Sequence, residues 1–259
     1  MVFLERFRGR VVVVTGGGSG IGAATARRFA AEGATAVVVG RTEEKLDRVV
    51  ASAPKGTTIA RYVADVGDEE AITQVIDAVA DEYGRLDTLV NNAGVAQLGT
   101  VEKLDTPAWR ASIATNLDGV FFASRAALPH LRAVGGSIVN VGSVSGLGGE
   151  WGMAAYSATK AAVANLTNAM AMDHGREGVR ANAVHPSYTS SEVIAPVIEL
   201  DAVREGLANR MPLGRSADPD EIAAVITFLA SEDASFVTGA QLRVDGGVGA
   251  TSGNPHLEF

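Results

Sequence analysis

The stretch of sequence that decides the fold is residues 10–22, RVVVVTGGGSGIG. Its first part, residues 10–15, is a β-branched run without polar alternation, which is typical of a strand buried on both faces of a parallel sheet. A glycine turn follows and leads into the Ala-rich residues 23–32, which we expect to be helical. Glycines let the backbone turn sharply and approach a pyrophosphate, and a helix N-terminus offers free N–H groups. The order of strand, glycine turn and helix predicts a dinucleotide-binding unit.

The same alternation of strand and helix continues along the chain. Further strands are predicted at residues 35–39, 57–64, 86–90, 136–141, 179–184 and 240–244. Helices are predicted at residues 42–52, 68–83 and 106–133, around Tyr156 as far as residue 174, and at residues 219–230, with Asp68 and Asp218 as N-caps. Neither a linker nor a repeat divides the chain. The sequence therefore predicts an α/β fold over residues 1–259, a single-domain Rossmann-type doubly wound parallel sheet of about seven strands with helices on both faces.

Composition narrows the class of protein. The chain has 259 residues, of which 47% are hydrophobic and 20% charged, as in a globular protein. A net charge of −8 without basic clusters argues against nucleic acid as a partner. No cysteine is present, and the four histidines lack metal-ligand spacing, so neither thiol chemistry nor a metal site is predicted. Charges interrupt the first ten residues and no apolar run has the length of a membrane span, so we expect a cytoplasmic protein without a membrane partner.

Polar and glycine-containing segments follow the predicted strands. Besides the glycine turn they are Arg41, Asp65, the Asn-Asn-Ala-Gly sequence at 91–94, Ser143 and Pro186. Ligands of doubly wound folds bind at the carboxyl ends of the strands. These segments are therefore expected to meet at one edge of the sheet and to form one site.

A second stretch, residues 143–160, reads SVSGLGGEWGMAAYSATK. Tyr156 and Lys160 are four positions apart in a predicted helix and therefore share one face. An adjacent cation favours a phenolate, so we expect Lys160 to lower the pKa of Tyr156 from its usual value of about 10 and to fit it for acid–base chemistry. Ser143 brings a hydroxyl to the same point. The alternative is an ordinary helix pair with Tyr156 half buried and Lys160 solvated.

Taken together, these motifs resemble the short-chain dehydrogenase/reductase family along nearly the whole chain. The resemblance lies in T-G-x-x-x-G-I-G at 15–22, Asp65, N-N-A-G at 91–94, Asn116, Ser143, Y-x-x-x-K at 156–160 and V-T-G-A-Q-L-R-V-D-G-G at 237–247. Each motif is modest alone, but their joint order and spacing are specific. The resemblance implies an oxidoreductase that transfers a hydride between a nicotinamide cofactor and a ketone or secondary alcohol.

The family resemblance also implies roles for individual residues. Tyr156 would be the general acid in reduction and the base in oxidation. Lys160 would hold the nicotinamide ribose, Ser143 would bind the substrate oxygen, and Asn116 would anchor a water leading away from Lys160. The remaining cofactor contacts would come from Gly16, Ser19, Gly20, Ile21 and Gly22 at the pyrophosphate, Asp65 and Val66 at the adenine, and Asn92, Ala93, Gly94, Pro186 and Ser187 along the rest of the cofactor. Ser187 stands where the family usually has glycine.

Two residues, Arg41 and Ser19, favour different nicotinamide cofactors. The predicted second strand ends in Gly40 and Arg41, without the acid that would bind the ribose hydroxyls. A guanidinium offers a fork for a 2′-phosphate, which favours NADP(H). Ser19, however, occupies a position where many NADP-using members carry a basic residue, so NAD(H) remains the alternative.

Three segments are expected to form the substrate walls: residues 95–98, 144–153 and 187–211, the last within a helix-bearing substrate loop at about 186–215. Their apolar and aromatic side chains suit a hydrophobic ketone or alcohol, with Glu150 as a polar handle; they are Leu98, Leu147, Trp151, Met153 and Tyr188. The leading interpretation is a carbonyl reductase or alcohol dehydrogenase, and the resemblance implies a homotetramer or homodimer. The alternatives are a 3-oxoacyl carrier-protein reductase and a non-catalytic NAD(P)-binding regulator.

Overall fold

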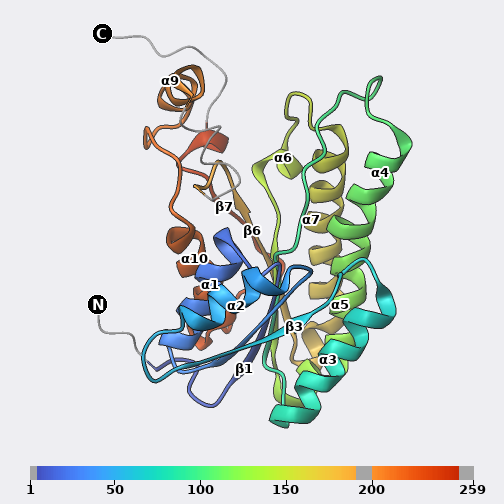
Figure 1. Ribbon diagram of the computed structural model, residues 1–259, viewed down its shortest axis with the longest axis vertical. Coiled ribbons are helices and arrows are strands. Elements are labelled where there is room, and N and C mark those ends of the chain that lie inside the picture. The colour runs from blue at the N-terminus through green and yellow to red at the C-terminus, as the bar shows by residue number, and fades with distance from the viewer. Residues whose placement is uncertain (1–4, 191–199, 251–259) are drawn as a thin grey trace.

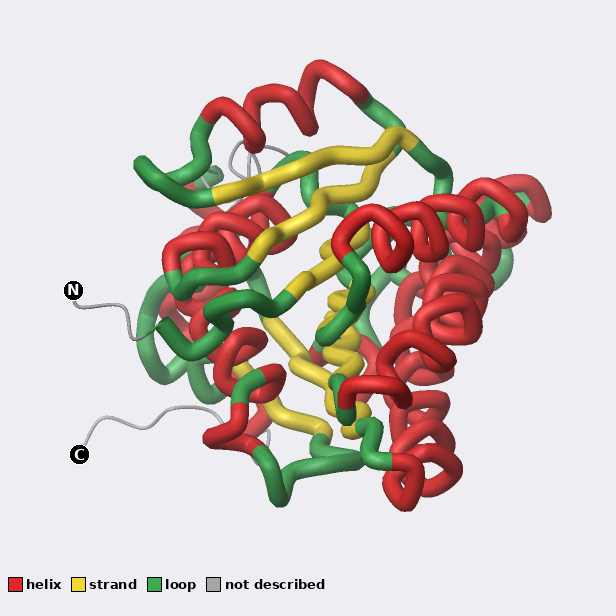
Figure 2. Tube along the Cα trace, turned by 90° about the horizontal axis from the view of Figure 1, so that it is seen from below, coloured by secondary structure: helices red, strands yellow, loops and turns green. Residues whose placement is uncertain are grey.

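The protein is built around one parallel β-sheet (Figures 1 and 2). The computed structural model describes residues 5–190 and 200–250. Within these ranges seven strands pair in the order β3-β2-β1-β4-β5-β6-β7, and every pair is parallel. The strands are β1 (Val11–Thr15), β2 (Thr35–Gly40), β3 (Thr58–Val63), β4 (Thr88–Asn91), β5 (Ser137–Val141), β6 (Arg180–Pro186) and β7 (Gln241–Val244). The predicted single-domain, doubly wound parallel sheet is confirmed.

The central strands are apolar on both sides because helices cover both faces of the sheet. Successive side chains of a strand point to opposite faces. In β1, Val12 and Val14 pack into one hydrophobic cluster with Phe29 and Ile222. Val11 and Val13 pack into the cluster on the other face, which includes Ile76, Leu131 and Met170. Because alternate residues of β1 enter two different hydrophobic clusters, every residue of the run has to be apolar, and four successive valines meet this need.

The helices divide between the two faces (Figure 1). The face of Val12 carries α1 (Gly20–Ala31), α2 (Glu43–Ala51) and α10 (Pro219–Ala230); the other carries α3 (Glu69–Tyr83), α5 (Gly119–Val134) and α7 (Ala154–His174). The short α6 (Val144–Leu147) and the helix α9 (Asp201–Arg210) lie at the upper end in this view. Asp68 and Asp218 cap α3 and α10 as predicted, because their carboxylates accept hydrogen bonds from backbone N–H groups of the first turn.

One predicted helix is not a single α-helix. Residues 106–133 form α4 (Thr106–Ile113), a π-helical turn (Ala114–Asp118) and α5. A π turn inserts one extra residue into the helical ladder, and such turns are frequent at functional sites. This one carries Asn116, so the prediction of one uninterrupted helix was wrong at the position that matters for the site.

The order of the strands places a crevice at their carboxyl ends. From β1 the chain proceeds outward to β2 and β3, and then returns to β4 on the other side of β1. The loops after β1 and β4 consequently diverge, and ligands of such sheets bind between them.

Of the predicted substrate loop at 186–215, residues 191–199 lie outside the described residues, as does the chain end from residue 251. No helix in the described ranges combines the length and apolar character needed to cross a bilayer.

Candidate functional site

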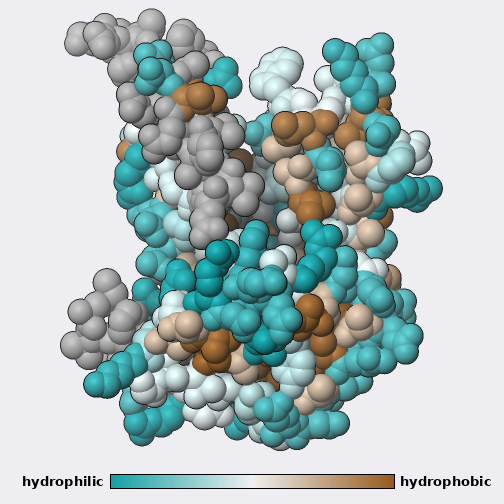
Figure 3. Space-filling view, viewed as in Figure 1, coloured by the Kyte–Doolittle hydropathy of each residue, from teal (hydrophilic) through white to brown (hydrophobic). Residues whose placement is uncertain are grey.

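A cavity of about 570 Å³ occupies this crevice. Loops after five strands line it, those after β1, β2, β4, β5 and β6, and Figure 3 shows hydrophobic side chains on the part of the surface that carries α6. The predicted site residues in its wall are Gly16, Ser19, Gly20, Ile21, Arg41, Asn92, Ala93, Gly94, Ser143, Tyr156, Lys160, Pro186 and Ser187. Residues far apart in the sequence thus meet in one cavity.

The glycine turn forms a close-packed cradle at the N-terminus of α1. A Cβ on Gly16 would lie 2.7 Å from the Cα of Ala93, and Gly16 has a φ of +63° that side chains rarely adopt. A Cβ on Gly22 would lie 2.5 Å from Nδ2 of Asn92. Backbone N–H groups and the helix dipole at this end suit a pyrophosphate. The cradle and the elongated cavity therefore fit a dinucleotide cofactor.

The loop after β4 is fastened to the end of β1. Asn92 donates from Nδ2 to the carbonyl oxygens of Thr15 and Gly16, at 3.0 Å each. The backbone N–H groups of Asn92 and Ala93 donate to Thr15 Oγ1, at 3.0 and 3.2 Å. Thr15, which carries no role in the sequence-based prediction, therefore fixes the relative positions of two walls of the cavity.

Asn116 holds the next part of the same loop. Its Oδ1 accepts from the N–H of Val95 at 2.8 Å, and its Nδ2 donates to the carbonyl of Val95 at 2.9 Å and to Thr159 Oγ1 at 3.1 Å. Asn116 is fully buried and does not line the cavity. Its amide ties the loop after β4 to α7, the helix of Tyr156, and its role as an anchor for water stays a prediction.

Lys160 is buried beneath Tyr156. The lysine is only 4% exposed, its Nζ donates to the carbonyl oxygen of Val141 at 2.7 Å, and it lies 5.6 Å from the centroid of the Tyr156 ring. Burial lowers the pKa of Lys160 to about 8. The interpretation of the pair as an ordinary surface helix pair with a solvated lysine is therefore wrong.

The pKa of Tyr156 is raised, not lowered as the sequence predicted. Burial is the largest cause, a hydrogen bond with Ser143 opposes it, and the negative charge of Glu150 adds to it. The four-residue spacing correctly predicted that Lys160 is a neighbour of Tyr156. The Lys160 ammonium, however, lies toward the aromatic ring and donates a hydrogen bond to the carbonyl of Val141. In this structure desolvation therefore determines the direction of the pKa shift.

Ser143 sits at the N-cap of α6 with its backbone and side chain both engaged. Its Oγ accepts from the N–H of Ser145 and donates to Ser145 Oγ, both at 3.1 Å. Its backbone N–H donates to Nδ1 of the buried His185 at 3.3 Å, and Nε2 of His185 pairs with Gln241 at 2.7 Å. Ser145 lies within the predicted substrate wall 144–153 but was given no role of its own, and His185 was not predicted as a site residue because no sequence motif points to it.

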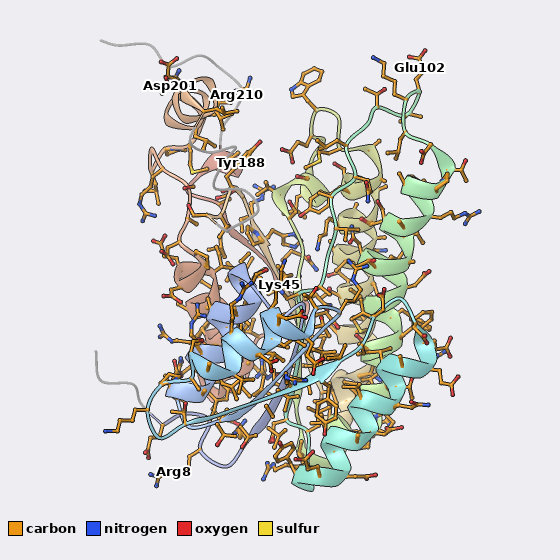
Figure 4. All side chains as sticks on the ribbon, viewed as in Figure 1. Arg8, Lys45, Glu102, Tyr188, Asp201 and Arg210 are labelled. Carbon is orange, nitrogen blue, oxygen red and sulfur yellow. The ribbon has the colours of Figure 1, made fainter. Side chains whose placement is uncertain are left out.

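Arg41 lines the part of the cavity that follows β2, and its guanidinium lies near the carboxylate of Asp65. Arg41 lies 3.5 Å from the Asp65 carboxylate, and both side chains are largely exposed. Lys45 of α2, also missed by the sequence-based prediction, lines the cavity and lies near the centre of Figure 4. Asp65, Val66 and Gly22 do not line the cavity; Val66 is buried and in contact range of Gly119. No group of three or more potential metal ligands occurs in the described ranges.

Comparisons with known proteins agree with this architecture. A family model described as enoyl-(acyl carrier protein) reductase matches residues 16–249. The chain is 48% identical to the meso-2,3-butanediol dehydrogenase of Serratia marcescens over 252 residues, 97% of this chain and 99% of that one. It is 36% identical to the NADP-dependent (R)-specific alcohol dehydrogenase of Lentilactobacillus kefiri, over 94% and 98% of the two chains. A short-chain dehydrogenase/reductase structure from Mycobacterium ulcerans superposes with a TM-score of 0.90 at 32% identity, covering 93% of this chain and 90% of that chain.

The chain therefore belongs to the short-chain dehydrogenase/reductase family. It is an oxidoreductase that transfers a hydride between a nicotinamide cofactor and an alcohol or ketone. This outcome confirms the predicted reaction and favours it over the alternative of a non-catalytic regulator.

Proposed function

We propose that the enzyme interconverts hydrophobic ketones and secondary alcohols, with NADP(H) as the favoured cofactor. The observation that carries this proposal is that Ser143, Tyr156 and Lys160 lie together at one end of a cavity whose other end offers Arg41 and Lys45. The proposed catalytic set is Asn116, Ser143, Tyr156 and Lys160. The cofactor contacts proposed are those set out from the sequence, with Lys45 added.

Each residue of the catalytic set has a task that its surroundings suit. A bound nicotinamide would supply or accept the hydride. Tyr156, kept protonated by burial, would donate its phenolic proton to the substrate oxygen in reduction and take it back in oxidation. Ser143 would hydrogen-bond the same oxygen where charge develops. Lys160, held by Val141, would be a ready donor to a ribose hydroxyl, and Asn116 would keep the Val95 loop in place.

Arg41 and Lys45 support the preference for NADP(H). Two cations at one end of the cavity suit the charge of a 2′-phosphate. Asp65 disfavours NADP(H), because its carboxylate already pairs with Arg41 at 3.5 Å and would repel a 2′-phosphate. The pair is largely exposed and therefore weak, so a phosphate can replace the carboxylate as the partner of Arg41.

Replacing Arg41 by serine tests this preference. We expect the KM for NADPH to rise about tenfold, the loss of one charge-assisted hydrogen bond, while the KM for NADH stays within about twofold. Arg48→Ser, an exposed change of the same kind on the following helix α2 and outside the cavity wall, is the matched control. An equal loss with both cofactors would contradict the assignment of Arg41 to the 2′-phosphate.

The raised pKa of Tyr156 sets the pH dependence of the two directions. Reduction needs the protonated phenol, which a raised pKa preserves at neutral pH and above. Oxidation needs the phenolate, whose fraction grows as the pH rises toward that pKa. We expect kcat/KM for alcohol oxidation to increase between about pH 6 and pH 9 while that for ketone reduction stays level or falls. Steady-state profiles in both directions would contradict this if oxidation were fastest at the acidic end.

The proposed substrate walls are residues 95–98, 144–153 and 187–211, of which Val95, Ala96, Ser187 and Thr189 line the cavity. The backbone of Gly99 bonds to that of Gly152 at 2.8 Å, which joins the loop before α4 to the loop before α7. Trp151 is 92% and Leu98 77% exposed, so neither side chain is packed beneath the loops and both can contact a substrate that enters between them. These exposed apolar side chains favour a hydrophobic substrate, with the 186–215 segment as the remaining wall.

A second candidate activity is the reduction of 3-oxoacyl carrier-protein substrates. The 3-oxoacyl-[acyl-carrier-protein] reductase FabG of Thermotoga maritima is 39% identical over 246 residues, 94% of this chain. A net charge of −8 counts against docking of an acidic carrier. Turnover of a 3-oxoacyl carrier-protein substrate at a higher kcat/KM than that of any free ketone would make this the better assignment.

We also propose a cytoplasmic homotetramer or homodimer. Several large apolar side chains of the described surface are exposed, among them Phe236, Met172 and Phe121. Exposed apolar surface of this kind is frequently buried between subunits. Light scattering of the purified protein would settle the number of subunits.

The direct test of the proposed function follows absorbance of the reduced cofactor with a panel of hydrophobic ketones, using NADPH and NADH in parallel. Faster oxidation of NADPH is the expected result. A preference for NADH would leave the assignment as an oxidoreductase intact and contradict the proposed cofactor. The absence of any absorbance change with both cofactors and all ketones of the panel would contradict the proposed substrate class.

A further inference from the structure

Glu150 is an acidic residue close to the catalytic hydroxyls. It is half-buried in the loop between α6 and α7, and its carboxylate accepts a hydrogen bond from Ser145 Oγ. Ser145 Oγ in turn accepts from Ser143 Oγ at 3.1 Å. The carboxylate is therefore no more than two hydrogen bonds away from the hydroxyl proposed to bind the reacting oxygen of the substrate.

The negative charge of Glu150 acts on two tyrosines, Tyr156 in the cavity wall and Tyr188 beside it in the chain segment after β6. Together with burial it raises the pKa of Tyr188, and it adds to the effect of burial on Tyr156. Tyr188 follows β6 and lies in the upper half of Figure 4, above Lys45. Glu150 does not itself line the cavity of about 570 Å³, but Ser143 and Tyr156, which it reaches through Ser145 and through its charge, do.

No cation compensates this carboxylate within the described residues. Neither a lysine, an arginine nor a histidine in those ranges forms an ion pair with Glu150. A carboxylate has about four acceptor positions on its two oxygens; Ser145 occupies one and the hydroxyl of Tyr188 a second, which leaves about two for a ligand. A half-buried carboxylate with free acceptor capacity beside a reacting centre favours a ligand that brings a hydrogen-bond donor.

We propose that Glu150 is a specificity-determining residue that accepts a hydrogen bond from a second hydroxyl of the substrate, on the carbon next to the reacting one. The preferred substrates are then α-hydroxyketones and vicinal diols. Keto acids are disfavoured, because a carboxylate at that carbon would face the charge of Glu150. This inference rests on the proposed function and specifies the substrate class of the same site.

Adjacent oxygens of a vicinal diol are separated by about the length of one hydrogen bond. With its reacting oxygen at Ser143 and Tyr156, such a substrate can place the second hydroxyl toward Ser145 and Glu150. The hydrogen bond from a neutral hydroxyl to a carboxylate is stronger than one to a neutral acceptor. A plain ketone leaves that acceptor unused, so the effect of Glu150 appears as a difference between substrates.

Three aromatic ketones of similar size test the proposal: acetophenone, α-hydroxyacetophenone and phenylglyoxylate. For the unmodified enzyme we expect kcat/KM for α-hydroxyacetophenone to exceed that for acetophenone by about tenfold or more, with phenylglyoxylate the poorest substrate. In Glu150→Gln, which still accepts from Ser145, the hydroxyketone should lose about tenfold, mainly through KM. The ratio of α-hydroxyacetophenone activity to acetophenone activity should therefore fall about tenfold, and phenylglyoxylate should improve relative to acetophenone because the repulsion is removed.

Glu102→Gln is the matched control. Glu102 lies in the exposed loop before α4 (Figure 4), so this variant makes the same change of charge on a neighbouring loop without touching Ser145. Its ratio of hydroxyketone to ketone activity should equal that of the unmodified enzyme.

An equal loss on all three substrates in Glu150→Gln would overturn the proposal, because Glu150 would then only position Ser143. Equal activity of the unmodified enzyme on ketone and hydroxyketone would overturn it while leaving the proposed function intact. No turnover of any of the three substrates with either cofactor would contradict the proposed function and this inference with it.

Discussion

Replacing Tyr156 by phenylalanine is expected to lower kcat by a factor of about 10³, within the range that a positioned general acid–base contributes. The substitution removes only the hydroxyl, and the ring can keep its place above Lys160. No other described phenol lies in the cavity wall to take over the proton. Binding of the cofactor should change little, since the glycine cradle is untouched.

Two measurements separate this role from a structural one. Cofactor titration followed by fluorescence should give the same dissociation constant for Tyr156→Phe and the unmodified enzyme, while turnover is lost. Tyr62→Phe, which removes a hydroxyl bonded to Glu82 on the surface, should keep full activity. Appreciable turnover in Tyr156→Phe would show that another group transfers the proton.

Replacing Gly22 by alanine is expected to weaken cofactor binding by about 10² or more, the cost of displacing binding groups by roughly 1 Å. A Cβ at this position would overlap the carbonyl oxygen of Gly16 and lie 2.5 Å from Asn92 Nδ2. The obstacle is backbone and cannot move away as a flexible side chain can. The glycine turn and the loop after β4 would therefore have to separate, although Gly22 itself does not line the cavity.

Circular dichroism and cofactor titration together decide the outcome for Gly22→Ala. Overpacking of this size costs about 1–3 kcal/mol of folding free energy, which a domain of this size tolerates. Gly175→Ala, where nothing lies within 4 Å of the added methyl group, is the control and should bind cofactor normally. A folded Gly22→Ala variant with unchanged affinity would contradict the role assigned to this close contact.

Local signals in the sequence predicted most of the fold. The helix α10 begins and ends at the predicted residues, because Asp218 caps it and Pro219 occupies the first turn. The two-sided burial of β1 follows from its unbroken valines. The glycine turn and the loops after the strands meet in one cavity, as parallel topology requires.

Features set by contacts between distant segments were not predictable in this way. The π turn at Ala114–Asp118 places Asn116 against Val95 and Thr159, which are 21 and 43 positions away. The direction of the Tyr156 pKa shift depends on burial and on where the Lys160 Nζ points, which spacing alone does not fix. Lys45 became a site residue only when α2 was placed beside the glycine turn.

The π turn at Asn116 also bears on how this region can change in length. Deleting one residue there would restore a regular α-helix and rotate the amide by about 100° about the helix axis. Asn116 would then lose Val95 and Thr159 together, although it does not line the cavity. Substitutions on the exposed side of α4 and α5 leave that geometry intact. Tolerance to insertion and deletion is consequently much lower in this helix than its solvent-facing positions suggest.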